Sequence, residues 1–124
     1  MRNLNQIATD LNSSKKVLVI GAAFVDIIVN IDKMPKSGGD VTGEYKGASV
    51  GGCAFNVADV LNKLKLPFDI FIPVGGGPYS KPVKEIMQQN GYPIYVEVTD
   101  HDNGWCMSLV EKNGERAFIS VPGI

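Results

Sequence analysis

Residues 51–64 read GGCAFNVADVLNKL, a glycine pair followed by the apolar spacing of a helix. Apolar side chains recur three, four and seven positions apart, which is the pattern of one buried helix face. They are Ala54, Val57, Ala58, Leu61 and Leu64. Lys63 and Lys65 suit the negative end of a helix dipole, and Pro67 cannot continue the helix. The stretch predicts a helix over 52–65 that begins directly after two glycines.

Strand patterns surround this helix. The segment KVLVI at 16–20 is a short continuous apolar run, as in a strand buried on both faces. Most other runs are β-branched or alternate in polarity, which favours strands. The predicted strands are 16–20, 24–31, 41–50, 68–74, 94–98, 105–111 and 116–121, and a second helix is predicted over 79–90, ending at Asn90-Gly91. Pro73 indicates that the strand over 68–74 ends there or lies at a sheet edge. Strands that alternate with helices predict an α/β protein with a mainly parallel sheet.

The last segment has a different pattern. Asn113-Gly114 lies between the β-rich runs 105–111 and 116–121, and Asn-Gly is the strongest short signal for a hairpin. We expect this hairpin to join strands 24–31 and 41–50 as a flap over one end of the parallel sheet.

The bulk composition narrows the functional classes. The 124 residues are 44% hydrophobic and 20% charged, as in one soluble domain. A net charge of -1 gives no basic face for nucleic acid, and no apolar run is long enough for a membrane span. Residues 1–15 lack a signal-peptide core and predict a flexible leader. Cys53 and Cys106 lack metal-ligand spacing, which favours free thiols in a cytoplasmic protein.

Two glycine-containing turns resemble nucleotide-binding loops only in part. Residues 75–81 follow a strand, but they lack the Gly-Lys-Ser/Thr ending of a phosphate loop. Residues 21–24 lack the later glycines of a dinucleotide fingerprint. We therefore expect loop geometry, not phosphate binding, at residues 75–81. His101, the single histidine, lies in a polar turn, where a solvated side chain is expected.

Two polar residues lie where a ligand could approach. Asp26 interrupts the apolar run FVDIIV, so its carboxylate must face solvent or find a partner. Asn56 lies just inside the helix behind Gly51-Gly52, where free N–H groups and a bare backbone can meet a ligand. Taken alone, Asp26 could be a solvent-facing strand residue and Asn56 a capping residue.

Residues 51–64 resemble the first signature of the pfkB, or ribokinase, family of carbohydrate kinases. That signature is a Gly-Gly pair, an Asn four residues after the second Gly, then Val-Ala and a leucine-rich helix. Asp26 upstream, and a Pro-x-x-Gly-like turn at 35–39 followed by Asp40, are similar to the family as well. The resemblance extends over 16–124 and implies part of a ribokinase-like three-layer α/β fold with a small β lid, formed by about 24–50 and 104–122.

The resemblance implies a role for each candidate site residue. Asp26 would accept hydrogen bonds from two sugar hydroxyls, and Asn56 would bind a further hydroxyl. Gly51 and Gly52 would let the sugar lie against the backbone. Phe24 replaces an Asn that assists the sugar in ribokinase itself, which implies a more apolar or differently shaped substrate than ribose. The lid would exclude water from the sugar.

The family's catalytic base lies in a carboxy-terminal Gly-Ala-Gly-Asp motif, which residues 1–124 do not contain. The resemblance therefore implies a longer parent kinase that binds ATP and Mg²⁺ outside this chain. The chain itself would have no catalytic residue, metal site, bound cofactor or activity. Its expected partners are a sugar or nucleoside and a second copy of the chain bound through the β lid. A non-catalytic sugar-binding or interaction module is the alternative, and a gene that continues to Gly-Ala-Gly-Asp would favour the kinase.

Overall fold

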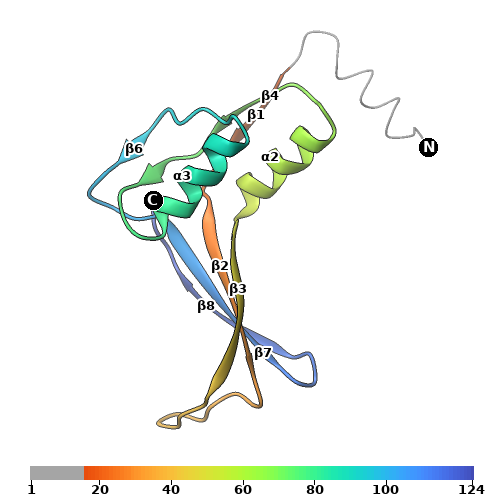
Figure 1. Cartoon of the computed structure of the whole chain (residues 1–124), viewed down its shortest axis with the longest axis vertical. Helices are drawn as coiled ribbons and strands as arrows, with labels where there is room; N and C mark the ends of the chain where they lie inside the picture. The colour runs from red at the N-terminus through yellow and green to blue at the C-terminus, as the bar shows by residue number, and fades with distance from the viewer. Residues whose placement is uncertain (1–15) are drawn as a thin grey trace, which may run out of the picture.

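The computed structural model describes residues 16–124 as an α/β structure, which confirms the predicted fold class. The predicted leader, residues 1–15, lies outside the described residues. Figure 1 shows a body that contains both helices and a set of long strands that extends away from it. The strands are β1 (Val17–Ile20), β2 (Phe24–Ile31), β3 (Gly43–Gly51), β4 (Phe68–Phe71), β5 (Val74–Gly75), β6 (Glu97–Val98), β7 (Gly104–Glu111) and β8 (Arg116–Val121), and the helices are α2 (Cys53–Lys63) and α3 (Ser80–Gln89).

The body forms around short parallel strand pairs. β1 pairs with β4 and β5 pairs with β6, both in parallel, as strands joined by helices must. Val19 and Ile70, from β1 and β4, lie in one apolar core with both helices. The helices contribute Ala54, Phe55, Ala58, Val83 and Met87 to this core.

The four-stranded sheet that the sequence analysis predicts as a lid, and that keeps this name below, consists of β2, β3, β7 and β8 in the spatial order β3-β2-β7-β8. β2 pairs antiparallel with β3 and parallel with β7, and β7 pairs antiparallel with β8 across the predicted hairpin. The four strands twist together as they leave the body (Figure 1). The β7–β8 hairpin therefore lies in the same sheet as β2 and β3, as the sequence predicted.

Both helices end with a residue in the left-handed region. Gly91 follows α3 with a φ of 69°, and its N–H donates to Gln88 O at 3.1 Å, so the predicted end of this helix is confirmed. Lys65 follows α2 with a φ of 55°. The helix predicted over 52–65 therefore ends at Lys63, two residues early, because Lys65 has left the helical conformation.

The strand predicted over 68–74 is interrupted. β4 ends before Pro73 and β5 begins after it, because proline has no N–H to donate to a strand ladder. The Pro73 carbonyl instead accepts a hydrogen bond from Asn103 Nδ2 at 3.2 Å. The strand predicted over 94–98 is also shorter, since only Glu97–Val98 pairs with a neighbour.

Candidate functional site

The candidate site lies where the lid meets the body, at the point where β3 leads into α2 (Figure 1). Gly51 ends β3, Asp26 lies on the neighbouring strand β2, and Asn56 lies in the first turn of α2. A methyl group on Gly51 would overlap Asp26 Oδ2 and would lie 3.9 Å from Asn56 Oδ1. The two polar side chains therefore converge over the bare Cα of Gly51, although thirty positions separate them in the sequence.

Gly52 is required by the turn between β3 and α2. Its φ of 96° is one that L side chains rarely adopt. An added methyl group would lie 2.8 Å from Ala22 O and 3.1 Å from Phe24 N, so the backbones of two segments pass close together here. Asn56 N–H donates to Gly52 O at 2.9 Å and starts the helix. The N–H groups before Asn56 have no partner within the helix, and they are available to a ligand at the site.

Asp26 belongs to a polar row across the lid. Strand register places Ser49 and Cys106 beside Asp26, and Ser120 beside Cys106. Ser120 Oγ donates to Cys106 Sγ at 3.3 Å. Within residues 16–124 the Asp26 carboxylate, which is partly buried, takes part in no ion pair and no side-chain hydrogen bond. Its oxygens can therefore accept hydrogen bonds from a ligand with hydroxyl groups.

Phe24 lies at the base of the same face of the lid. It pairs in register with Gly51 on one side and Gly104 on the other. A methyl group on Gly104 would lie 2.6 Å from Phe24 Cε1, so the ring lies against the bare backbone of β7. Phe24 thus forms an apolar wall beside Asp26. All five sequence-predicted residues, Phe24, Asp26, Gly51, Gly52 and Asn56, come together at this junction.

The glycine loop before α3 is packed against protein on one side. Methyl groups on Gly75, Gly76 and Gly77 would each collide with residues 99–102, and the other side of the loop lines a cavity of about 440 Å³. Asp102 occupies the helix start, where it accepts hydrogen bonds from the N–H groups of Tyr79 at 3.1 Å and Ser80 at 2.7 Å. A fixed carboxylate at these donors would repel a second anion. Loop geometry, as expected from the sequence, explains the glycines.

Asp102 and Asn103 are the polar residues that sequence reasoning missed. Burial alone would raise the pKa of Asp102, but hydrogen bonds from Ser80, Tyr79 and Asn103 lower the pKa below its ordinary value. Asn103 is almost fully buried. Neither lies in a periodic segment, so local pattern gave no signal. The adjacent His101 is exposed and contacts Asp100, which agrees with the expected solvated turn.

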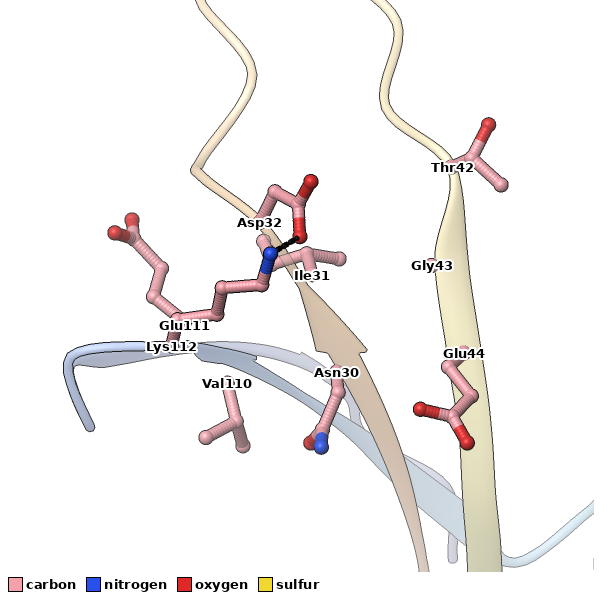
Figure 2. A pocket seen from close by; sticks show the side chains of 9 residues that line it. All are labelled: Asn30, Ile31, Asp32, Thr42, Gly43, Glu44, Val110, Glu111 and Lys112. Carbon is pink, nitrogen blue, oxygen red and sulfur yellow. Dashed lines mark ion pairs between the residues drawn. The ribbon is translucent and has the colours of Figure 1, made fainter.

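A cavity of about 450 Å³ lies at the far end of the lid and contains none of the predicted site residues. Figure 2 shows its lining, with the Lys112 Nζ–Asp32 Oδ1 ion pair of 2.7 Å. Glu111 accepts a hydrogen bond from Met34 N–H at 2.9 Å, which ties the 32–42 loop to β7. These contacts are local to the lid tip, so we assign the candidate site to the junction at Gly51.

No group of three or more His, Cys, Asp and Glu side chains in residues 16–124 could hold a metal ion. None of the helices described is long and apolar enough to cross a membrane.

Comparisons with known proteins place these features in a family context. A family model described as "pfkB family carbohydrate kinase" matches residues 14–124. The sugar kinase YegV of Escherichia coli (strain K12) is 33% identical over 121 residues, which cover 98% of this chain and 38% of that protein. The ribokinase of Arabidopsis thaliana is 24% identical over 111 residues, covering 86% of this chain and 29% of that protein.

Solved structures share the fold. A ribokinase from Thermotoga maritima matches with a TM-score of 0.76 and 24% identity, over 87% of this chain and 36% of that one. A nucleoside kinase from Methanocaldococcus jannaschii matches with a TM-score of 0.71 and 18% identity, over 90% of this chain and 38% of that one. The chain thus spans less than two fifths of the length of each of these relatives.

Proposed function

Because the chain belongs to the pfkB family of carbohydrate kinases, we propose that it is the sugar-binding segment of an ATP-dependent kinase acting on a sugar or nucleoside hydroxyl. The observation that carries this proposal is the convergence of Asp26 and Asn56 over Gly51, with the Asp26 carboxylate open to hydroxyl donors. The ribokinase of Arabidopsis thaliana, a structural relative, has been solved with ribose and ATP.

The geometry suits recognition of a polyhydroxylated ring. Asp26 would accept hydrogen bonds from two adjacent hydroxyls, because a carboxylate has two oxygens and no donors. Asn56 and the free N–H groups at the start of α2 would hold a further oxygen. Phe24 would pack against the apolar side of the substrate, which favours a ligand less polar at that edge than ribose. The lid would exclude water from the transferring phosphoryl group.

The uncovered face of the β1–β4 pair supports a larger parent protein. Leu18 and Ile20 alternate with buried Val19, yet they are 63% and 68% exposed. Phe71 on β4 is also exposed, and its ring stacks on Tyr95 with centroids 6.2 Å apart. Parallel strands are buried on both faces in folded α/β proteins. In this proposal, the remaining segment of the parent kinase covers these side chains and completes the three-layer domain.

ATP, Mg²⁺ and the catalytic base belong to that remaining segment in this proposal. Phosphoryl transfer requires that the charge of the nucleotide is neutralised and that the acceptor hydroxyl loses its proton. The residues described here would bind only the acceptor. Cys53 and Cys106 are free thiols, which fits a reducing cytoplasm.

We expect the purified 124-residue chain to release no ADP from ATP and Mg²⁺ when a panel of sugars and nucleosides is supplied. The reason is that the acceptor site alone neither binds nor orients the γ-phosphate. A coupled ADP assay against a mock preparation measures this. Sugar-dependent ADP release that disappears in an Asp26→Ala variant would show that the chain itself is a kinase. The positive test is the same panel with the product of the extended gene, which should phosphorylate at least one sugar or nucleoside.

We also propose that two copies associate through their lids. Strand alternation places an apolar face on the side of the lid opposite Asp26. Its paired rows are Val25–Trp105–Val121 and Ile27–Met107–Ile119. Val25 is buried in the core, and Ile27 and Trp105 pack against that core. The exposed part of this face is on the edge strand β8, where Ile119 is 49% and Val121 38% exposed. Exposed apolar side chains on an edge strand are typical of an interaction surface, and a two-fold dimer is the commonest closed assembly.

Light scattering at micromolar concentration should therefore give about twice the chain mass of 13.3 kDa. Ile119→Lys should shift the protein to monomer, because it places a charge in the apolar contact. Phe118→Lys is the matched control: it changes the adjacent position on the Asp26 side of β8 and should leave the dimer intact. A mass of 13.3 kDa that does not change with concentration would rule the lid dimer out, and a dimer that survives Ile119→Lys would place the contact elsewhere.

A further inference from the structure

Asn103 lies at the boundary between lid and body. It directly precedes β7, and Ala23 directly precedes β2, so the two central lid strands leave the body side by side at Phe24 and Gly104. Asn103 is only 2% exposed. A buried amide at this place must find partners, because an unsatisfied amide costs free energy.

The Asn103 side chain bonds to three backbone groups from two parts of the molecule. Its Oδ1 accepts from Gly75 N–H at 3.0 Å, and its Nδ2 donates to Pro73 O at 3.2 Å. Nδ2 also faces Ala23 O at 3.5 Å, the longest of the three contacts. One planar amide therefore links β5 of the body to the residue from which β2 departs.

The backbone of Asn103 is held from the body as well. Its N–H donates to Ser80 Oγ and to Asp102 Oδ1, both at 2.9 Å. Asp102 in turn accepts the N–H groups of Tyr79 and Ser80 at the start of α3. The start of α3 thus holds Asn103 in place, and Asn103 holds the starts of β2 and β7.

This arrangement bears directly on the candidate site. Asp26 belongs to the lid, three residues after Ala23, whereas Asn56 belongs to helix α2 of the body. Their convergence over Gly51 therefore depends on how β2 is placed relative to α2. A small rotation of β2 about its start would move Asp26 while Asn56 stayed in place.

We propose that Asn103 is a positioning residue that sets the angle of the lid, and through it the separation of Asp26 and Asn56. The inference rests on the proposed function, since it assigns Asn103 to the binding of the same sugar. Asn103 touches no substrate in this scheme, and its effect reaches the sugar only through β2.

Asn103→Asp in the parent kinase is the decisive variant, because it keeps the shape of the side chain and removes both N–H donors. Its carboxylate would face the Pro73 and Ala23 carbonyls without a proton to share. We expect the sugar KM to rise about tenfold or more, as for the loss of one or two buried hydrogen bonds, while the ATP KM stays within about twofold. Steady-state kinetics with each substrate varied in turn measures the two values.

Gly91→Ala is the matched control for a purely structural loss. It strains the end of α3, where Gly91 has a φ of 69°, and contacts neither Asn103 nor its partners, so it should lower the melting temperature and keep the sugar KM. If Asn103→Asp does not fold, Asn103→Ser is measured in its place, because it adds no buried charge and still breaks the link to Ala23.

The outcomes separate this inference from the proposed function. A wild-type parent that phosphorylates no sugar or nucleoside would overturn the proposed function. An active parent in which the Asn103 variant keeps its sugar KM, or raises the KM of sugar and ATP equally, would overturn the positioning role alone.

Discussion

Replacing Asp26 by Ala in the parent kinase is expected to lower kcat/KM for the native sugar by roughly 10- to 150-fold, as for a lost hydrogen bond to a charged group of about 1.5–3 kcal/mol. The carboxylate has no competing partner among residues 16–124, so its hydrogen-bonding capacity is available to the substrate. Steady-state kinetics on the best sugar of the panel gives this ratio. Because Asp26 is only partly buried, the melting temperature should change little.

Two further variants serve as comparisons for Asp26→Ala. Asn56→Ala should lower kcat/KM by a smaller factor, because the hydrogen bond that it removes joins two neutral groups. Asp69→Ala removes a carboxylate on β4 that pairs with Lys16 at 3.4 Å on the exposed surface, and it should leave kcat/KM unchanged. If the Asp26 and Asn56 variants both keep the wild-type ratio, the sugar lies elsewhere.

The sequence was sufficient to predict those parts of the structure that a few adjacent residues determine. Residues 51–64 contain the helical spacing, the two glycines and Asn56 within one short stretch, so the start of α2 could be predicted together with the candidate site residues. The hairpin could be predicted in the same way, because Asn113-Gly114 forms the turn that aligns β7 with β8. In both cases a few adjacent residues determine the geometry.

The remaining features depend on contacts between distant residues. Asp102 bonds to Ser80, which is 22 positions earlier in the chain, and Asn103 bonds to Ala23, which is 80 positions earlier. Local sequence patterns therefore could not predict the contacts of either residue. The break of the 68–74 strand, by contrast, is local, because Pro73 has no N–H to donate to a strand ladder. Strand register, which places Cys106 beside Asp26, is also fixed only when the whole lid assembles.

The lid illustrates how one sheet can serve two surfaces. Successive residues of β2 point to opposite faces, so Asp26 faces the candidate site while Val25 and Ile27 face the other way. Val25 packs in the core of the body, and the exposed apolar residues of that face are on β8. In the proposal above, the Asp26 face binds the sugar and the β8 edge of the opposite face binds a second copy. A dimer contact on β8 would reach the strand that bears Asp26 through β7, which pairs with both β8 and β2.

Gly51→Ala is expected to abolish most of the parent kinase's activity while the fold persists. The added methyl group would overlap Asp26 Oδ2, which is the end of a side chain that can rotate away. Folding therefore loses little, but the carboxylate leaves its place over Gly51 and the methyl group fills the space where the sugar would lie. We expect kcat/KM to fall at least as far as for Asp26→Ala, that is by roughly 10- to 150-fold or more, with a nearly unchanged melting temperature.

Gly52→Ala is the comparison variant for Gly51→Ala, because its added methyl group would meet backbone instead of a side chain. There the methyl group would meet backbone atoms, Ala22 O at 2.8 Å and Phe24 N at 3.1 Å, at a φ of 96°. Backbone cannot rotate away, so Gly52→Ala should lower the melting temperature as well as the activity. Kinetics and thermal unfolding of both variants, measured side by side, separate the two effects. A Gly51→Ala kinase with wild-type kcat/KM would mean that the sugar does not approach this glycine.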